Sequence, residues 1–72
     1  MLISELQEKL EKVKQEFGDV EVYMECWNTV DARHVCVVLD EYDDSFVVYI
    51  TDNVEGLEEI FENVDFKLIC EF

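Results

Sequence analysis

The chain contains no proline, two glycines and five Lys or Arg residues among its 72 positions. Because no Pro-rich or Gly-rich stretch marks a linker, a single domain over residues 1–72 is predicted. Gly18 and Gly56 stand in neither a G-x-G nor a G-K-[ST] context, which excludes a phosphate-binding loop. Five basic residues against 19 acids exclude direct nucleic-acid binding, since that affinity comes largely from cations that neutralise phosphates.

Long apolar runs are also absent. No stretch approaches the roughly 18 apolar residues of a membrane span, and the N-terminus lacks a cationic segment followed by an apolar one. We therefore expect a cytoplasmic protein that neither crosses nor binds a membrane. Cys26, Cys36 and Cys70 are odd in number, lack CxxC spacing and lie in apolar runs, so buried reduced thiols are predicted.

Positive charge is missing from one long segment. Residues 1–17 carry four Glu against three Lys, so 13 of the 14 net negative charges fall in residues 18–72. No Lys or Arg stands between Arg33 and Lys67, a segment with ten carboxylates: Asp40, Glu41, Asp43, Asp44, Asp52, Glu55, Glu58, Glu59, Glu62 and Asp65. Such a field repels nucleic acid and acidic membranes and attracts cationic surfaces.

The composition nevertheless indicates a folded protein. Half of the residues are hydrophobic and 12% are aromatic, whereas acidic disordered segments are poor in both. A core of this size rarely leaves more than about 3 to 5 kcal/mol of net stability, and self-repulsion lowers that value. We therefore expect stability to rise with salt, which screens surface charge.

The first element is an amphipathic helix over about residues 4–17. Ser4 is its expected N-cap, with Gln7 closing a capping box, and Gly18 can adopt the left-handed conformation that ends it. The apolar stripe recurs at spacings of four and three: Ile3, Leu6, Leu10, Val13 and Phe17.

Apart from one short helix, the rest of the chain predicts strands: side chains alternate with a period of two in the first and last strands, and the middle two are β-branched runs. Strands are predicted over 19–27, 34–39, 46–51 and 65–72, with the second and third joined as a hairpin by an acidic tip at 40–45. After the third strand, Thr51 or Asp52 is expected to cap a helix together with Glu55. The apolar stripe of that helix is Leu57, Ile60, Phe61 and Val64.

The predicted fold is a small α+β domain in the order α-β-β-β-α-β, with a mainly antiparallel four-stranded sheet and two helices on one face. The strand order stays open. The other sheet face would then expose apolar side chains: Tyr23, Trp27, Cys36, Val38, Val47, Tyr49 and Ile69. A second copy of the chain or a protein partner could cover it, or else residues 27–33 and the chain ends could fold over it.

Catalytic and metal sites find little support in the residues. His34 and Cys36 lie two apart on a strand, but no Gly-rich turn or oxyanion motif accompanies them. Cys26, Cys36, Cys70 and His34 could supply four zinc ligands, although their spacing fits no zinc knuckle. The acidic tip lacks EF-hand spacing, so at most weak Ca²⁺ or Mg²⁺ association is expected. No cofactor and no catalytic residue are predicted.

The acidic residues are the better candidates for a partner-binding site. Glu55, Glu58, Glu59 and Glu62 follow at spacings of three and four, about 5 to 6 Å apart at Cβ, on the side of the helix away from its apolar stripe. Such a row resembles phosphates along a nucleic-acid strand, although it could equally be a solvated helix face. The predicted partner-binding residues are Asp40, Glu41, Tyr42, Asp43, Asp44, Asp52, Glu55, Glu58, Glu59 and Glu62, with Tyr42, Trp27 or Tyr49 as apolar anchors.

The opening Ser4-Glu5-Leu6-Gln7-Glu8-Lys9-Leu10, followed by Phe17-Gly18-Asp19-Val20-Glu21-Val22, resembles the start of many short phage and prophage proteins. Small size, acidity and the lack of catalytic motifs are similar to phage anti-defence proteins, such as DNA mimics and anti-CRISPR proteins. The resemblance implies an inhibitor in a bacterial cell whose partner is a basic nucleic-acid-handling protein, such as a CRISPR or restriction effector. The alternative is a small interaction module that dimerises through its sheet, with acidity serving solubility.

Overall fold

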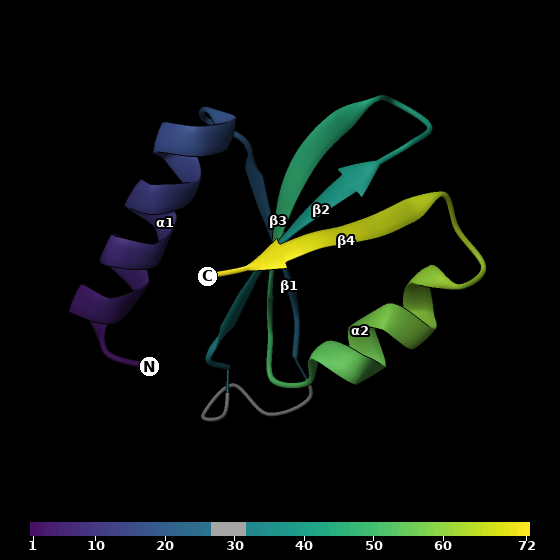
Figure 1. Cartoon of the computed structure of the whole chain (residues 1–72). Coiled ribbons are helices and arrows are strands. Elements are labelled where there is room, and N and C mark those ends of the chain that lie inside the picture. The colour runs from purple at the N-terminus through teal and green to yellow at the C-terminus, as the bar shows by residue number, and fades with distance from the viewer. Residues whose placement is uncertain (27–31) are drawn as a thin grey trace.

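A computed structural model describes residues 1–26 and 32–72 of the chain. Residues 27–31, which include the predicted anchor Trp27 and the end of the first predicted strand, lie outside the described part. The element order is α1 (Ile3–Phe17), β1 (Glu21–Glu25), β2 (His34–Asp40), β3 (Ser45–Thr51), α2 (Val54–Phe61) and β4 (Phe66–Glu71) (Figure 1). The predicted α-β-β-β-α-β order is confirmed.

The four strands form one sheet in the order β1-β3-β2-β4. The β2–β3 hairpin is antiparallel, with Val37 opposite Val48, and β4 pairs antiparallel with the other side of β2. β1 pairs with β3 in parallel, so the sheet is mixed although mostly antiparallel, as expected. β1 and β4 are therefore the two edge strands.

The helices lie against opposite faces of the sheet, and the prediction that they share one face is wrong. α1 packs its Val13 on Val35 and Val37 of β2 and on Val48 and Ile50 of β3. The intervening strand residues point the other way, since side chains alternate along a strand. They form the second cluster with α2, made of Cys36, Val38, Val47, Tyr49, Leu57 and Phe61 together with β4 residues.

This arrangement corrects the expectation of an exposed apolar sheet face. Cys36 and Val38 are fully buried, and Tyr49 packs its ring on Phe61 of α2 with centroids 5.2 Å apart. Of the described members of the predicted face, only Tyr23 and Ile69 are exposed, and they lie on opposite edge strands. The surface proposed for dimerisation through the sheet is thus largely covered by α2.

A β-bulge in β4 distributes its apolar residues over both cores. The register with β2 shifts between Val37, which pairs with Cys70, and Val38, which pairs with Leu68. Leu68 consequently faces α2, whereas Cys70 faces α1. Because a bulge adds one residue to one strand, it reverses the face to which all later side chains point. The strict alternation in the sequence had placed these residues on a single face.

Both helices begin at residues other than the predicted caps. The N-cap of α1 is Leu2, without a side-chain cap, and Ser4 lies inside the helix. In α2 the cap is Asn53, whose Oδ1 accepts a hydrogen bond of 3.1 Å from the Gly56 backbone N–H, instead of Thr51 or Asp52. Thr51 is buried at the end of β3, and its Oγ1 accepts a hydrogen bond from the Asn53 N–H.

Candidate functional site

The acidic hairpin tip lies at one end of the sheet, where β2 turns into β3. Asp40 Oδ1 accepts hydrogen bonds from the backbone N–H groups of Tyr42 and Asp43, at 3.0 and 3.3 Å. Asp44 adopts a left-handed backbone conformation with φ of 55°, which Asp tolerates better than most residues. The Asp40 carboxylate is therefore occupied in shaping the turn, and it holds Tyr42, Asp43 and Asp44 out in solvent.

Tyr42 is the most exposed aromatic residue of the described chain, at 85% of its full surface. It projects from a turn whose backbone is fixed by the Asp40 carboxylate. Because the backbone at this position is already fixed, it loses little further freedom on binding, which suits an anchor. Tyr49, the other described candidate anchor, is half-buried between β3 and α2 and is not available in the same way.

α2 brings a second group of acids beside the tip. The Glu41 backbone N–H donates a hydrogen bond of 2.8 Å to the carbonyl of Asp65, in the turn that connects α2 to β4. Figure 1 shows the hairpin tip, this turn and α2 on the same side of the molecule. The exposed acids of this region form what we term the acidic band: Glu41, Asp43, Asp44, Glu55, Glu58, Glu59, Glu62 and Asp65.

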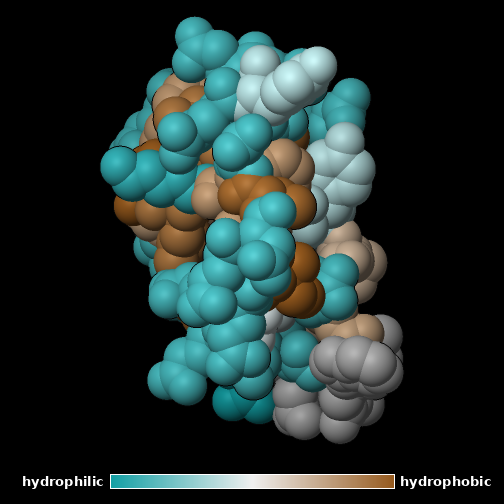
Figure 2. Space-filling view, turned by 90° about the vertical axis from the view of Figure 1, so that its right-hand side faces the viewer, coloured by the Kyte–Doolittle hydropathy of each residue, from teal (hydrophilic) through white to brown (hydrophobic). Residues whose placement is uncertain are grey.

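The acidic band is exposed and unneutralised within the described part of the chain. Ion pairs there join Lys12 to Glu8 and His34 to Glu71, and none involves a member of the band. Figure 2, which views this side of the molecule, shows mainly hydrophilic residues with smaller hydrophobic areas between them. A recess of about 420 Å³ between α2 and β4 is lined by Glu58 and Glu62 and by Lys67, the first cation after Arg33.

Two of the predicted site residues do not belong to this surface, and one unpredicted residue does. Asp52 precedes α2, at the end of the helix away from the tip, is half-buried and makes an interaction within the chain. Asp40 serves the turn. Asp65 joins the two acidic groups, but only the pairing of β2 with β4 reveals this, and that pairing has no local signal in the sequence.

Only half of the apolar stripe predicted for α2 is buried, so the surface that carries the acidic band also contains apolar side chains. Leu57 and Phe61 are buried in the core. Ile60 and Val64 are about half exposed, and Val64 lies in the turn beyond the helix. Glu62 is the C-cap of α2 and not a member of its interior. Apolar side chains thus stand beside the acids, a mixture found at protein interfaces.

Neither of the other candidate sites has the geometry of a reactive centre. Burial raises the pKa of the Cys36 thiol to about 11, so this sulfur is protonated at neutral pH. His34 Nδ1 contacts Glu71 Oε2 at 2.5 Å. The four suggested zinc ligands divide between the two faces of the sheet, since Cys26 and Cys70 join the α1 cluster while Cys36 belongs to the α2 cluster. No group of three metal-ligating side chains occurs among the described residues.

No helix in residues 1–26 and 32–72 is long and apolar enough to cross a membrane. No family of proteins, no curated protein sequence and no solved structure matches this chain.

Proposed function

We propose that this protein is a non-catalytic acidic inhibitor that binds a basic nucleic-acid-handling protein and blocks its nucleic-acid site. The observation that carries the proposal is the acidic band, in which the hydrogen bond from Glu41 to Asp65 places the hairpin tip beside the turn that follows α2. Bacterial defence complexes such as CRISPR effectors and restriction enzymes present suitable cationic channels. On this view the protein is a phage-encoded inhibitor of the anti-CRISPR or DNA-mimic type, in line with the resemblance of its N-terminal third to short phage and prophage proteins.

The spacing of the band supports mimicry of a nucleic-acid strand. From Glu55 to Glu62 the acids advance about 10 Å along the helix axis, at 1.5 Å per residue. Four carboxylates over that length approach the charge density of one DNA strand, which carries a phosphate per ~3.4 Å. The tip extends the row beyond the end of α2.

Net charge and anchoring support the proposal independently. A net charge of −14 exceeds the magnitude of about 2 to 8 that suffices for solubility in a small domain. Long-range attraction would raise the association rate, and desolvated anchors would lower the dissociation rate. Tyr42 is placed at the tip for the second task.

The test is capture of proteins from a nuclease-treated bacterial lysate by the immobilised chain, with DNA or RNA as competitor. The charge-reversed variant carries Asp43→Lys and Glu59→Lys in the acidic band. The matched control carries Glu5→Lys and Glu16→Lys on α1, which changes net charge by the same amount away from the band. Circular dichroism establishes that both variants fold.

We expect the unaltered chain and the α1 control to capture the same nucleic-acid-handling protein, and the band variant to lose it. Free nucleic acid should displace the captured protein. Equal capture by the band variant, or capture that nucleic acid does not affect, would refute the proposal.

A further inference from the structure

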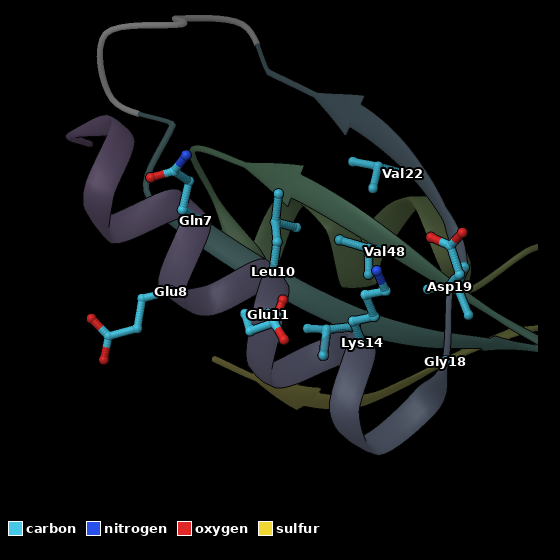
Figure 3. A pocket seen from close by; sticks show the side chains of 11 residues that line it. Gln7, Glu8, Leu10, Glu11, Lys14, Gly18, Asp19, Val22 and Val48 are labelled. Carbon is cyan, nitrogen blue, oxygen red and sulfur yellow. The ribbon is translucent and has the colours of Figure 1, made fainter.

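A second surface, separate from the acidic band, lies between α1 and β1. It is a groove of about 630 Å³ whose floor is apolar, with Leu10 and Val13 from α1 and Val48 from β3. In Figure 3, Leu10 and Val48 point into the space between helix and sheet, Val22 lies across from them, and Glu8 points away. Val13 and Val48 are buried, so the groove reaches down to the core.

The strand that borders this groove is open on its outer side. Among residues 1–26 and 32–72, β1 is an edge strand that pairs only with β3, so every second backbone N–H and C=O along it faces outward. Its apolar side chains are exposed on both faces: Val22 and Met24 on the α1 side, at 47% and 60%, and Tyr23 on the α2 side. Of the features that protect edge strands, Glu21–Glu25 has short length and a Glu at each end, but no lysine, proline or bulge.

Charge determines what can cover such an edge. The groove is bordered by Glu8, Glu11 and Asp19 against the single cation Lys14. On the opposite face of β1, Glu21 and Glu25 stand at the two ends of the strand. A segment that pairs with β1 would therefore meet Val22 and Met24 within an acidic rim on one face. On the other face it would meet Tyr23 between Glu21 and Glu25.

A second copy of this chain does not fit these requirements. In the two-fold register that pairs all five residues of antiparallel β1 strands, Glu21 of one copy lies opposite Glu25 of the other, twice, and like charges directly opposite each other destabilise a sheet. The two copies would also bring 28 net negative charges together, twice the charge of one chain. The acidic residues around the groove and at both ends of β1 instead favour a positively charged occupant.

We propose that β1 and the α1–β1 groove bind an extended cationic segment of a partner protein by strand addition. The segment adds to the outer edge of β1, which satisfies the free backbone groups. Its side chains alternate, so apolar residues enter the groove beside Val22 and Met24, while Lys or Arg residues face Glu21 and Glu25. This surface does not depend on the acidic band, and the inference stands apart from the proposed inhibitor function.

The test uses a synthetic peptide of about nine residues in which Lys and Val alternate, close to the length of a typical strand. Its control has the same charge, with alternate valines replaced by proline, which cannot donate ladder hydrogen bonds. Binding to the full chain is followed by ¹⁵N-resolved NMR titration and by amide hydrogen exchange. We expect shifts in β1 and around Leu10 and Val48, slower exchange of β1 amides, and at least about tenfold weaker binding of the proline peptide.

Two protein variants with the same net charge locate the site. Val22→Lys places a cation at the β1 edge, and Ile69→Lys places one at the opposite edge, where Ile69 is 41% exposed. We expect the first to weaken peptide binding about tenfold and the second to change it less than about threefold. Glu59→Lys in the acidic band should behave like Ile69→Lys.

Three results would overturn the inference. Equal binding of the proline peptide would mean attraction by charge alone. Shifts centred on the hairpin tip and α2 would assign the peptide to the acidic band. Groove shifts without protection of the β1 amides would indicate a docked helix or coil instead of an added strand.

Discussion

Two apolar residues of α2, three positions apart, differ sharply in what surrounds them. Leu57 is buried between the helix and the sheet, whereas Ile60 is 48% exposed. Replacing a buried Leu by Ala typically costs about 2 to 5 kcal/mol, which is comparable to the whole stability of a domain of this size. We therefore predict that Leu57→Ala is largely unfolded at room temperature, while Ile60→Ala keeps most of its stability, as measured by urea denaturation. Equal losses in the two variants would contradict the packing of α2.

The Cys36 thiol should make stability depend on pH in the alkaline range. Burial raises its pKa from 9.0 to about 11, so the folded state keeps the proton that the unfolded state loses. The stability that this difference contributes is fully present below pH 9 and is lost as pH rises towards 11. Its size follows from the conversion of one pKa unit to about 1.4 kcal/mol. Urea denaturation across this range should show a steeper decline for the unaltered chain than for Cys36→Ala. Identical slopes would contradict the prediction.

The sequence and the structure assign different residues as the N-caps of the two helices, and substitution can decide between them. The side chain of Asn53 caps α2, while Ser4 lies within α1 and caps nothing. Replacing a capping Asn by Ala typically costs about 1 kcal/mol, whereas Ala inside a helix is at least as favourable as Ser. We predict that Asn53→Ala lowers the free energy of unfolding by about 1 kcal/mol and that Ser4→Ala leaves it unchanged or slightly raised. The reverse result would mean that the capping box drawn from the sequence is correct.

The elements themselves could be predicted because their signals are local. The spacing of Leu6, Leu10 and Val13 specifies a helix, and the β-branched apolar runs at 34–39 and 46–51 specify strands joined by a short tip. The parallel pairing of β1 with β3 could not be predicted, since it joins residues 26 positions apart with no turn between them. The bulge in β4 was hidden for a related reason, because the sequence alternates without interruption through Leu68 and Cys70.

The candidate site was predictable in its chemistry and only partly in its geometry. The carboxylates of α2 could be placed on one side of a helix from their spacing alone. That they adjoin the hairpin tip depends on β4 pairing with β2, which brings Asp65 to Glu41. The α1–β1 groove was missed altogether, because both helices were assigned to one face and β1 had no assigned position in the sheet.

At the scale of the molecule, two thin cores share one sheet. The principal dimensions are 32 × 27 × 15 Å, and each helix covers only part of its face. α2 covers the side that the sequence had suggested for dimerisation, while the β1 edge stays open next to α1. The acidic band and the β1 edge are thus two distinct surfaces on a single small domain, so separate variants can test them.

The net charge of the molecule should make its stability depend on ionic strength. The acidic band holds eight carboxylates without an ion pair in the described structure, and like charges at helical spacings of three and four are destabilising. We predict that the melting temperature rises as NaCl is added up to about 0.5 M, where charges more than a few ångströms apart are screened. The variant Glu59→Gln with Glu62→Gln should start from a higher melting temperature and respond less to salt than Glu5→Gln with Glu16→Gln. A melting temperature that falls with added NaCl would mean that attraction between charges, and not repulsion, dominates this surface.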